Sequence, residues 1–131
     1  MKRSMQWVVW VMTLALAVLA GWAAPMHSAG LSDVIERPAE RALLTGMRAY
    51  DDAQYAQAER ALNTALHSGL ASPKDRASAH KLLAFIYCTS SRMGDCEASF
   101  RAARQADPAF TLSRSEAGHP LWGPVYRKVV P

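Results

Sequence analysis

The residues of this chain best suited to covalent chemistry are its two cysteines, Cys88 and Cys96. Their spacing is neither the C-x-x-C of thiol redox enzymes nor that of a haem attachment motif. In an antiparallel helical hairpin that turns around residues 91–94, the two positions come level, and a disulfide closing so short a loop contributes roughly 2–3 kcal/mol. The spacing therefore predicts a structural disulfide, with two buried free thiols as the alternative.

No other group of polar residues forms a catalytic or metal-binding pattern. The four histidines are His27, His67, His80 and His119. They are far apart and lack metal-ligand spacing. There is no glycine-rich phosphate loop, no G-x-S-x-G and no pair of catalytic carboxylates, since Asp51-Asp52 fits a charged turn. The sequence predicts a protein that is not an enzyme and holds no metal or cofactor.

The elements that position the cysteines are amphipathic helices. Apolar residues at helical spacing predict helices over residues 38–52, 54–68, 73–90 and 95–106. Pro38 and Ser72-Pro73 suit the first turn of the first and third helices, and Gly69 suits the end of the second. No strand-like alternation of useful length occurs. Short links between such helices predict antiparallel hairpins and an all-α fold.

The two hairpins match each other when the chain is shifted by 38 residues. The matched pairs are Gly46 with Ala84, Ala49 with Tyr87, Ala58 with Cys96, Leu62 with Phe100, and Ala65 with Ala103. A regular shift of this length indicates a helical repeat architecture.

These matched positions resemble the tetratricopeptide repeat (TPR). In that family small residues let the two helices of a hairpin approach closely, and a proline often ends the unit, as in Asp107-Pro108. The stretch Ala49–Ala58 resembles the TPR inter-helix turn. The period departs from the usual 34 residues, which places four extra residues in the loop around Ser68–Pro73. The usual tryptophan of the first helix is replaced by Ala42 and His80.

The resemblance implies a concave groove lined by the first helix of each hairpin. By position, its residues are Leu43, Met47 and Tyr50 in the first hairpin, and Lys81 and Phe85 in the second. Methionine and aromatic side chains suit a protein-binding or peptide-binding surface. The alternative is that Leu43 and Met47 belong to the core.

Two hairpins are too few to bury all their apolar surface, so a C-terminal cap is expected. The Ser113–Glu116 stretch fits a capping box and predicts a helical turn at 113–117. A last helix is expected from near Gly123. We predict that Trp122 packs on the second hairpin with Val125 or Tyr126 beside it.

The first residues form a separate segment. Lys2 and Arg3 precede an uncharged stretch from Trp7 to Ala24, which predicts a signal peptide over residues 1–23 or an uncleaved anchor. Residues 24–36 are expected to be a linker, and 37–131 the TPR domain with its cap. Removing Lys2 and Arg3 lowers the net charge of +4 by two, so the basic character is poor support for nucleic-acid binding.

A narrower resemblance covers about residues 40–130. Residues 80–88, 107–110 and 116–126, above all the run from Gly118 to Pro124, are similar to small TPR lipoproteins of type VI secretion gene clusters. The resemblance implies an exported adaptor for a protein or peptide partner in the bacterial envelope. It would be periplasmic or inner-membrane anchored, touching the membrane only through the N-terminal segment. The alternative is a periplasmic assembly chaperone or pilotin-like factor. No cysteine follows the apolar run, so lipidation there is excluded.

Overall fold

The structure, a computed structural model, describes residues 37–130 and contains only helices in that range. They are α3 (Pro38–Asp51), α4 (Tyr55–His67), α5 (Pro73–Thr89), α6 (Met93–Ala106), α7 (Arg114–Ala117) and α8 (Gly123–Val129). The expected signal peptide (1–23) and linker (24–36) lie outside the described residues. No helix within residues 37–130 is long and apolar enough to cross a membrane.

The helix limits follow from local chemistry. Pro73 begins α5, and the Ser72 hydroxyl accepts a hydrogen bond from the Asp75 amide at 3.2 Å, as expected for a serine cap. Helix α6 begins at Met93, two residues before the predicted start at residue 95. The difference arises because Ser91 adopts a positive φ of 62° and reverses the chain at once.

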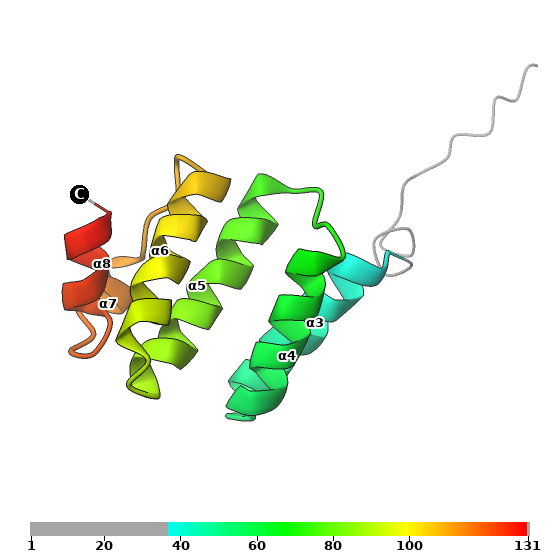
Figure 1. Ribbon diagram of the computed structural model, residues 1–131, viewed down its shortest axis with the longest axis horizontal. Coiled ribbons are helices and arrows are strands. Elements are labelled where there is room, and N and C mark those ends of the chain that lie inside the picture. Colours follow the sequence, from blue (N-terminus) through cyan, green and yellow to red (C-terminus); the bar gives the residue numbers. More distant parts are fainter. Residues whose placement is uncertain (1–36, 131) are drawn as a thin grey trace, which may run out of the picture.

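The helices pack as two hairpins and a smaller C-terminal pair (Figure 1). Helix α3 packs along α4, and α5 along α6. Helix α5 also contacts α4 and α3, which joins the hairpins, while α8 contacts α6 and α7. The predicted all-α fold is confirmed for the described part of the chain.

The two hairpin turns have the same backbone geometry, 38 residues apart. Ala53 has φ 60° and Ser91 has φ 62°, both left-handed conformations without glycine. The Gln54 amide donates to the Ala49 carbonyl at 2.7 Å, and the Arg92 amide donates to the Tyr87 carbonyl at 2.8 Å. Positive φ is uncommon for residues other than glycine, so the shared geometry of the two turns is a distinctive similarity between the hairpins.

The matched positions are also buried in both hairpins. Leu62 and Phe100 are fully enclosed, as are Ala65 and Ala103. At Gly46 a side chain would collide with α4, because a Cβ placed there lies 2.7 Å from Cγ of Leu62. The absence of a side chain at this glycine therefore permits the close approach of α3 and α4.

Candidate partner-binding face

The five predicted groove residues lie on adjacent helices, with Leu43, Met47 and Tyr50 on α3 and Lys81 and Phe85 on α5. We call this set the α3/α5 face. Its residues differ in exposure. Met47 is 40% exposed, and Tyr50 and Lys81 are half-buried. Leu43 and Phe85 are core residues, only 6% and 4% exposed. A partner could touch Met47 and the edges of Tyr50 and Lys81, whereas Leu43 and Phe85 support the face from beneath.

An aromatic row crosses this face. The ring centroids of Tyr55 and Tyr50 lie 5.5 Å apart, and those of Tyr50 and Phe85 lie 6.5 Å apart. Trp122 from the cap stacks on Phe85 at 4.2 Å, and His119 stacks on Trp122 at 3.3 Å. Aromatic contacts of this kind add to the stability gained from burial alone. The row joins the first hairpin, the second hairpin and the cap into one surface.

An ion pair ties the cap to the same face. Lys81 Nζ lies 2.7 Å from a carboxylate oxygen of Glu116 and 5.8 Å from the centroid of the Phe85 ring. Glu116 also accepts a hydrogen bond from the Ser113 amide at 2.9 Å, which completes the predicted capping box. The second contact of Glu116 was not predicted, since its partner lies 35 residues away.

Two titratable groups have shifted pKa values, Tyr50 on the α3/α5 face and Glu116 beside it. Partial burial acts to raise the pKa of Glu116, but the Lys81 ammonium and the hydrogen bonds from Ser113 outweigh it and hold this pKa below 4.5. The pKa of Tyr50 is raised, first by burial and then by electrostatic interactions with Tyr55, Glu116 and Asp51. The Tyr50 phenol therefore stays protonated at neutral pH and is available to donate a hydrogen bond.

We expect the stabilising effect of Glu116 to depend on pH. Because the folded state lowers the pKa of Glu116, its contribution is complete above the unfolded value of 4.5 and is lost as the pH falls through the lower folded value. Glu116→Gln should therefore reduce the free energy of unfolding at pH 7, and the deficit should shrink at pH 3. Urea unfolding across this pH range measures it.

A double-mutant cycle with Lys81→Met isolates the ion pair. The coupling free energy between positions 81 and 116 should favour the native pair at pH 7 and vanish once Glu116 is protonated. A coupling energy that is the same at pH 7 and pH 3 would contradict this assignment.

The cap residues were all singled out from the sequence. Trp122 Nε1 donates to the Glu116 carbonyl at 2.8 Å, and this places the indole over Phe85. Tyr126 is 9% exposed, and its ring contacts Phe100 at 5.5 Å. Val125 is half-buried against the core. Trp122 thus contacts α5 and Tyr126 contacts α6, so the cap holds both helices of the second hairpin.

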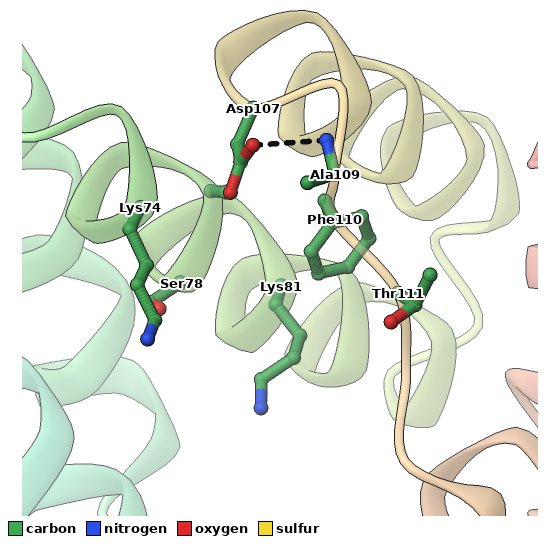
Figure 2. A pocket seen from close by; sticks show the side chains of 8 residues that line it. Lys74, Ser78, Lys81, Asp107, Ala109, Phe110 and Thr111 are labelled. Carbon is green, nitrogen blue, oxygen red and sulfur yellow. Dashed lines mark hydrogen bonds between the residues drawn. The ribbon is translucent and has the colours of Figure 1, made fainter.

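A cavity of about 280 Å³ adjoins the α3/α5 face, between α5 and the segment after α6 (Figure 2). Lys74, Ser78 and Lys81 line it from α5. On the opposite side, the Asp107 carboxylate accepts a hydrogen bond from the Ala109 amide at 2.9 Å. The lysines and the serine hydroxyl offer hydrogen-bond donors beside the exposed edge of the face. Lys74 and Ser78 were not predicted as lining residues, because segment 107–111 is placed by tertiary contacts.

Cys88 and Cys96 form a disulfide across the second hairpin, with Cα atoms 5.2 Å apart. The sequence left open a disulfide or two buried free thiols, and the structure contains the disulfide. Cys88 is 2% exposed and Cys96 is fully enclosed, so solvent has little access to either sulfur atom. A disulfide so enclosed has a structural role, since thiol exchange requires access to the sulfur atoms.

Replacing both cysteines should lower stability by about 2–3 kcal/mol, because the loop is no longer closed in the unfolded chain. For a domain of this size we expect Cys88→Ser/Cys96→Ser to lower the Tm by roughly 10–20 °C. Thermal unfolding followed by circular dichroism, with and without reductant, measures the effect. Reductant should lower the Tm of the native chain but leave that of the variant unchanged. Two alkylated cysteines in the folded, unreduced protein would show that the thiols are free.

The histidines in the described region are dispersed. His80 lies between the hairpins, next to Asn63 and Leu66 of α4, and burial lowers its pKa. His67 Nδ1 lies 2.7 Å from the Asn63 carbonyl oxygen. His119 belongs to the aromatic row, which its sequence position did not reveal. Within residues 37–130 no three His, Cys, Asp or Glu side chains gather closely enough to hold a metal ion.

Comparison with known proteins does not assign this chain to a family. No protein-family model matches the chain, and neither a curated protein nor a solved structure is significantly similar to it.

Proposed function

We propose that this chain is an exported tetratricopeptide-type adaptor that binds a protein or peptide partner in the bacterial envelope through the α3/α5 face. Its role is binding rather than catalysis. The proposal extends to an accessory part in type VI secretion, on the strength of the resemblance around Gly118–Pro124. The location is the periplasm, or the inner membrane if segment 1–23 stays attached.

The repeat geometry supports the tetratricopeptide assignment. The hairpins share buried positions and the same left-handed turn, and Gly46 lets α3 approach Leu62 of α4 closely. The cap supports it as well, because two such units leave an apolar end that needs cover.

The observation that carries the binding function is the exposed Met47 beside the aromatic row. Met47 and Tyr50 lie one helical turn apart on α3, so their side chains share one face. Methionine adapts its shape to a partner, and aromatic rings provide a large contact area. The ammonium groups of Lys74 and Lys81 lie beside this apolar surface and add hydrogen-bond donors.

Site-specific photo-crosslinking tests this function. A photoreactive phenylalanine analogue replaces Met47 in the full chain, in cells that carry the native partner. We expect a light-dependent adduct with an envelope protein, identified by mass spectrometry. The matched control carries the analogue in place of Arg60, which is exposed on α4 and lies outside the face. Equal adducts at both positions, or none at position 47, would refute the assignment of the face.

The identity of the adduct separates the two versions of the function. A component of the type VI secretion membrane complex or sheath supports the adaptor role, whereas an assembling subunit of another envelope complex supports a chaperone or pilotin-like role. A folded Cys88→Ser/Cys96→Ser variant should still complement a deletion strain, because neither version uses thiol chemistry.

A further inference from the structure

A second recess lies between α4 and α6, away from the α3/α5 face, and its floor is α5. Two cavities of about 240 and 270 Å³ share the lining residues Asn63, Leu66 and His80, so they form one continuous cleft. Leu83 and Tyr87 complete the floor, and the wall on α6 consists mainly of small residues: Ala98, Ser99 and Ala102. We call this recess the α4/α6 cleft.

Two hydroxyl groups on the cleft lining, those of Ser99 and Tyr87, bond to none of the described residues and remain open to solvent. Ser99 and Tyr87 are each 8% exposed. Among residues 37–130 neither hydroxyl makes a hydrogen bond, yet neither oxygen is sealed from solvent. Both residues line the cleft. Each can hydrogen-bond to water or to a ligand that displaces that water.

Further hydrogen-bonding groups line the same cleft. Asn63 uses its amide nitrogen to donate to the Glu59 carbonyl at 2.9 Å, and this leaves its side-chain oxygen to accept. The His80 ring makes no hydrogen bond within the described range. Together with Ser99 and Tyr87, these groups offer both donors and acceptors above an apolar floor.

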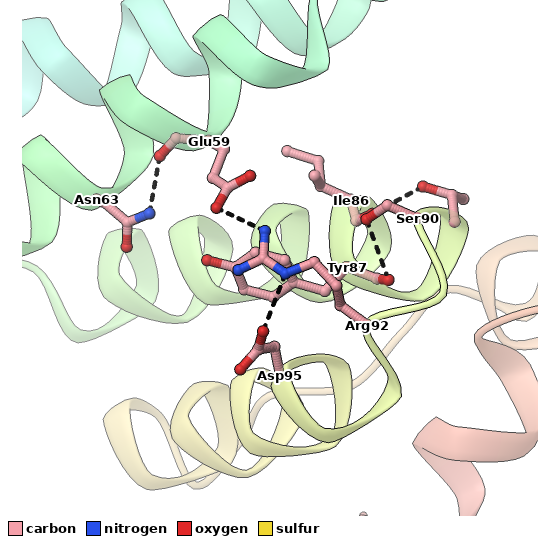
Figure 3. Close-up of polar contacts among 8 residues, drawn as sticks. Glu59, Asn63, Ile86, Tyr87, Ser90, Arg92 and Asp95 are labelled. Carbon is pink, nitrogen blue, oxygen red and sulfur yellow. Dashed lines mark hydrogen bonds and ion pairs between the residues drawn. The ribbon is translucent and has the colours of Figure 1, made fainter.

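The cleft offers no free charge to a ligand. Asp95, the carboxylate on its lining, is held by Arg92 at 3.0 Å, and Arg92 also binds Glu59 at 2.8 Å (Figure 3). The Arg92 guanidinium lies over the Tyr87 ring at 4.2 Å from its centroid. Burial lowers the pKa of His80, so its imidazole is neutral at pH 7. The other titratable side chains on the lining are His67 and Tyr87.

From this arrangement we propose that the α4/α6 cleft binds an extended, uncharged peptide segment that carries an apolar side chain such as leucine. The main chain of an extended peptide alternates donors and acceptors, matching the hydroxyls of Ser99 and Tyr87, the Asn63 oxygen and the His80 ring. The apolar side chain rests on Leu66 and Leu83. A charged side chain is excluded because the cleft has no free counter-charge to offset its desolvation.

The test uses nuclear magnetic resonance on the full chain with a defined probe, the blocked tripeptide acetyl-Ala-Leu-Ala-amide. Titration should give saturable shifts of the amide signals of Asn63, His80 and Ser99. The blocked tripeptide with glutamate in the central position should bind at least tenfold more weakly. No saturable shift, or equal affinity for the two tripeptides, would overturn the proposal.

Substitutions on the cleft lining test whether the tripeptide binds in the α4/α6 cleft. Ala98 is exposed on the cleft wall, so Ala98→Trp should fill the cleft and weaken binding at least tenfold. Gln105→Trp is the matched control, since Gln105 is exposed on the same helix but outside the lining, and binding should be retained. Ser99→Ala removes one hydrogen bond without adding bulk and should weaken binding about two- to tenfold. Unchanged binding by both Ala98→Trp and Ser99→Ala would locate the probe elsewhere and refute the cleft.

The outcome does not depend on the proposed adaptor role. The crosslinking experiment examines α3 at position 47, and the titration examines α4 and α6. A tripeptide that binds in the cleft while position 47 gives no adduct would support this inference and refute the function assigned to the α3/α5 face.

Discussion

Deletion of residues 118–131 is expected to abolish the cooperative thermal unfolding of the domain. The deletion removes Trp122, which stacks on Phe85, and Tyr126, which covers Phe100. Two aromatic residues of the core would then face solvent. Since a small domain is stable by only about 5–15 kcal/mol, losing both contacts takes most of that margin. Circular dichroism should show a broad transition with no defined midpoint.

The single substitution Trp122→Ala measures how much of this loss of stability comes from the tryptophan alone. Trp122 is half-buried, so its truncation should cost less than the 3–5 kcal/mol typical of a fully buried tryptophan, about 2–3 kcal/mol. Leu121→Ala is the matched control. Leu121 is 47% exposed beside it, and its truncation should leave the transition nearly unchanged. A truncated chain that melts like the full one would show that the hairpins are stable without the cap.

Phe100→Ala should have the largest effect of any single substitution, a loss of about 3–5 kcal/mol. Phe100 is fully enclosed, and its ring contacts Phe85 at 6.1 Å and Tyr126 at 5.5 Å. Truncation leaves a cavity between the second hairpin and the cap, which these elements cannot fill without moving. The Tm should fall by roughly 15–30 °C, as measured by calorimetry.

Phe100→Leu tests whether this loss comes from volume. Leucine fills most of the cavity, so the cost should stay near 1–1.5 kcal/mol. If alanine and leucine were equally destabilising, the ring contacts rather than the volume would determine stability. If neither had an effect, the core described around Phe100 would be wrong.

The features that were predictable from the sequence depend on neighbouring residues. Pro73 and Ser72 fix the start of α5, and the capping box fixes α7, because each motif acts within one helical turn. The hairpin of Cys88 and Cys96 was predictable for the same reason, since only seven residues separate the cysteines. The exposure of groove residues was not predictable. Phe85 lies at a groove position, but a tryptophan 37 residues later covers it.

The remaining features of the site required the tertiary structure. The ion pair of Lys81 with Glu116 joins residues far apart in the chain, and either charge alone resembles an ordinary solvated side chain. The α4/α6 cleft likewise combines three helices. A serine and three small or polar neighbours on α6 give no signal of a cleft until α4 is placed opposite them.

The position of α8 has a consequence for what the second hairpin leaves exposed. Helix α8 lies against α6, and the Tyr126 ring covers Phe100. Apolar surface that a partner or a second copy of the chain would otherwise contact is thereby already occupied from within the chain.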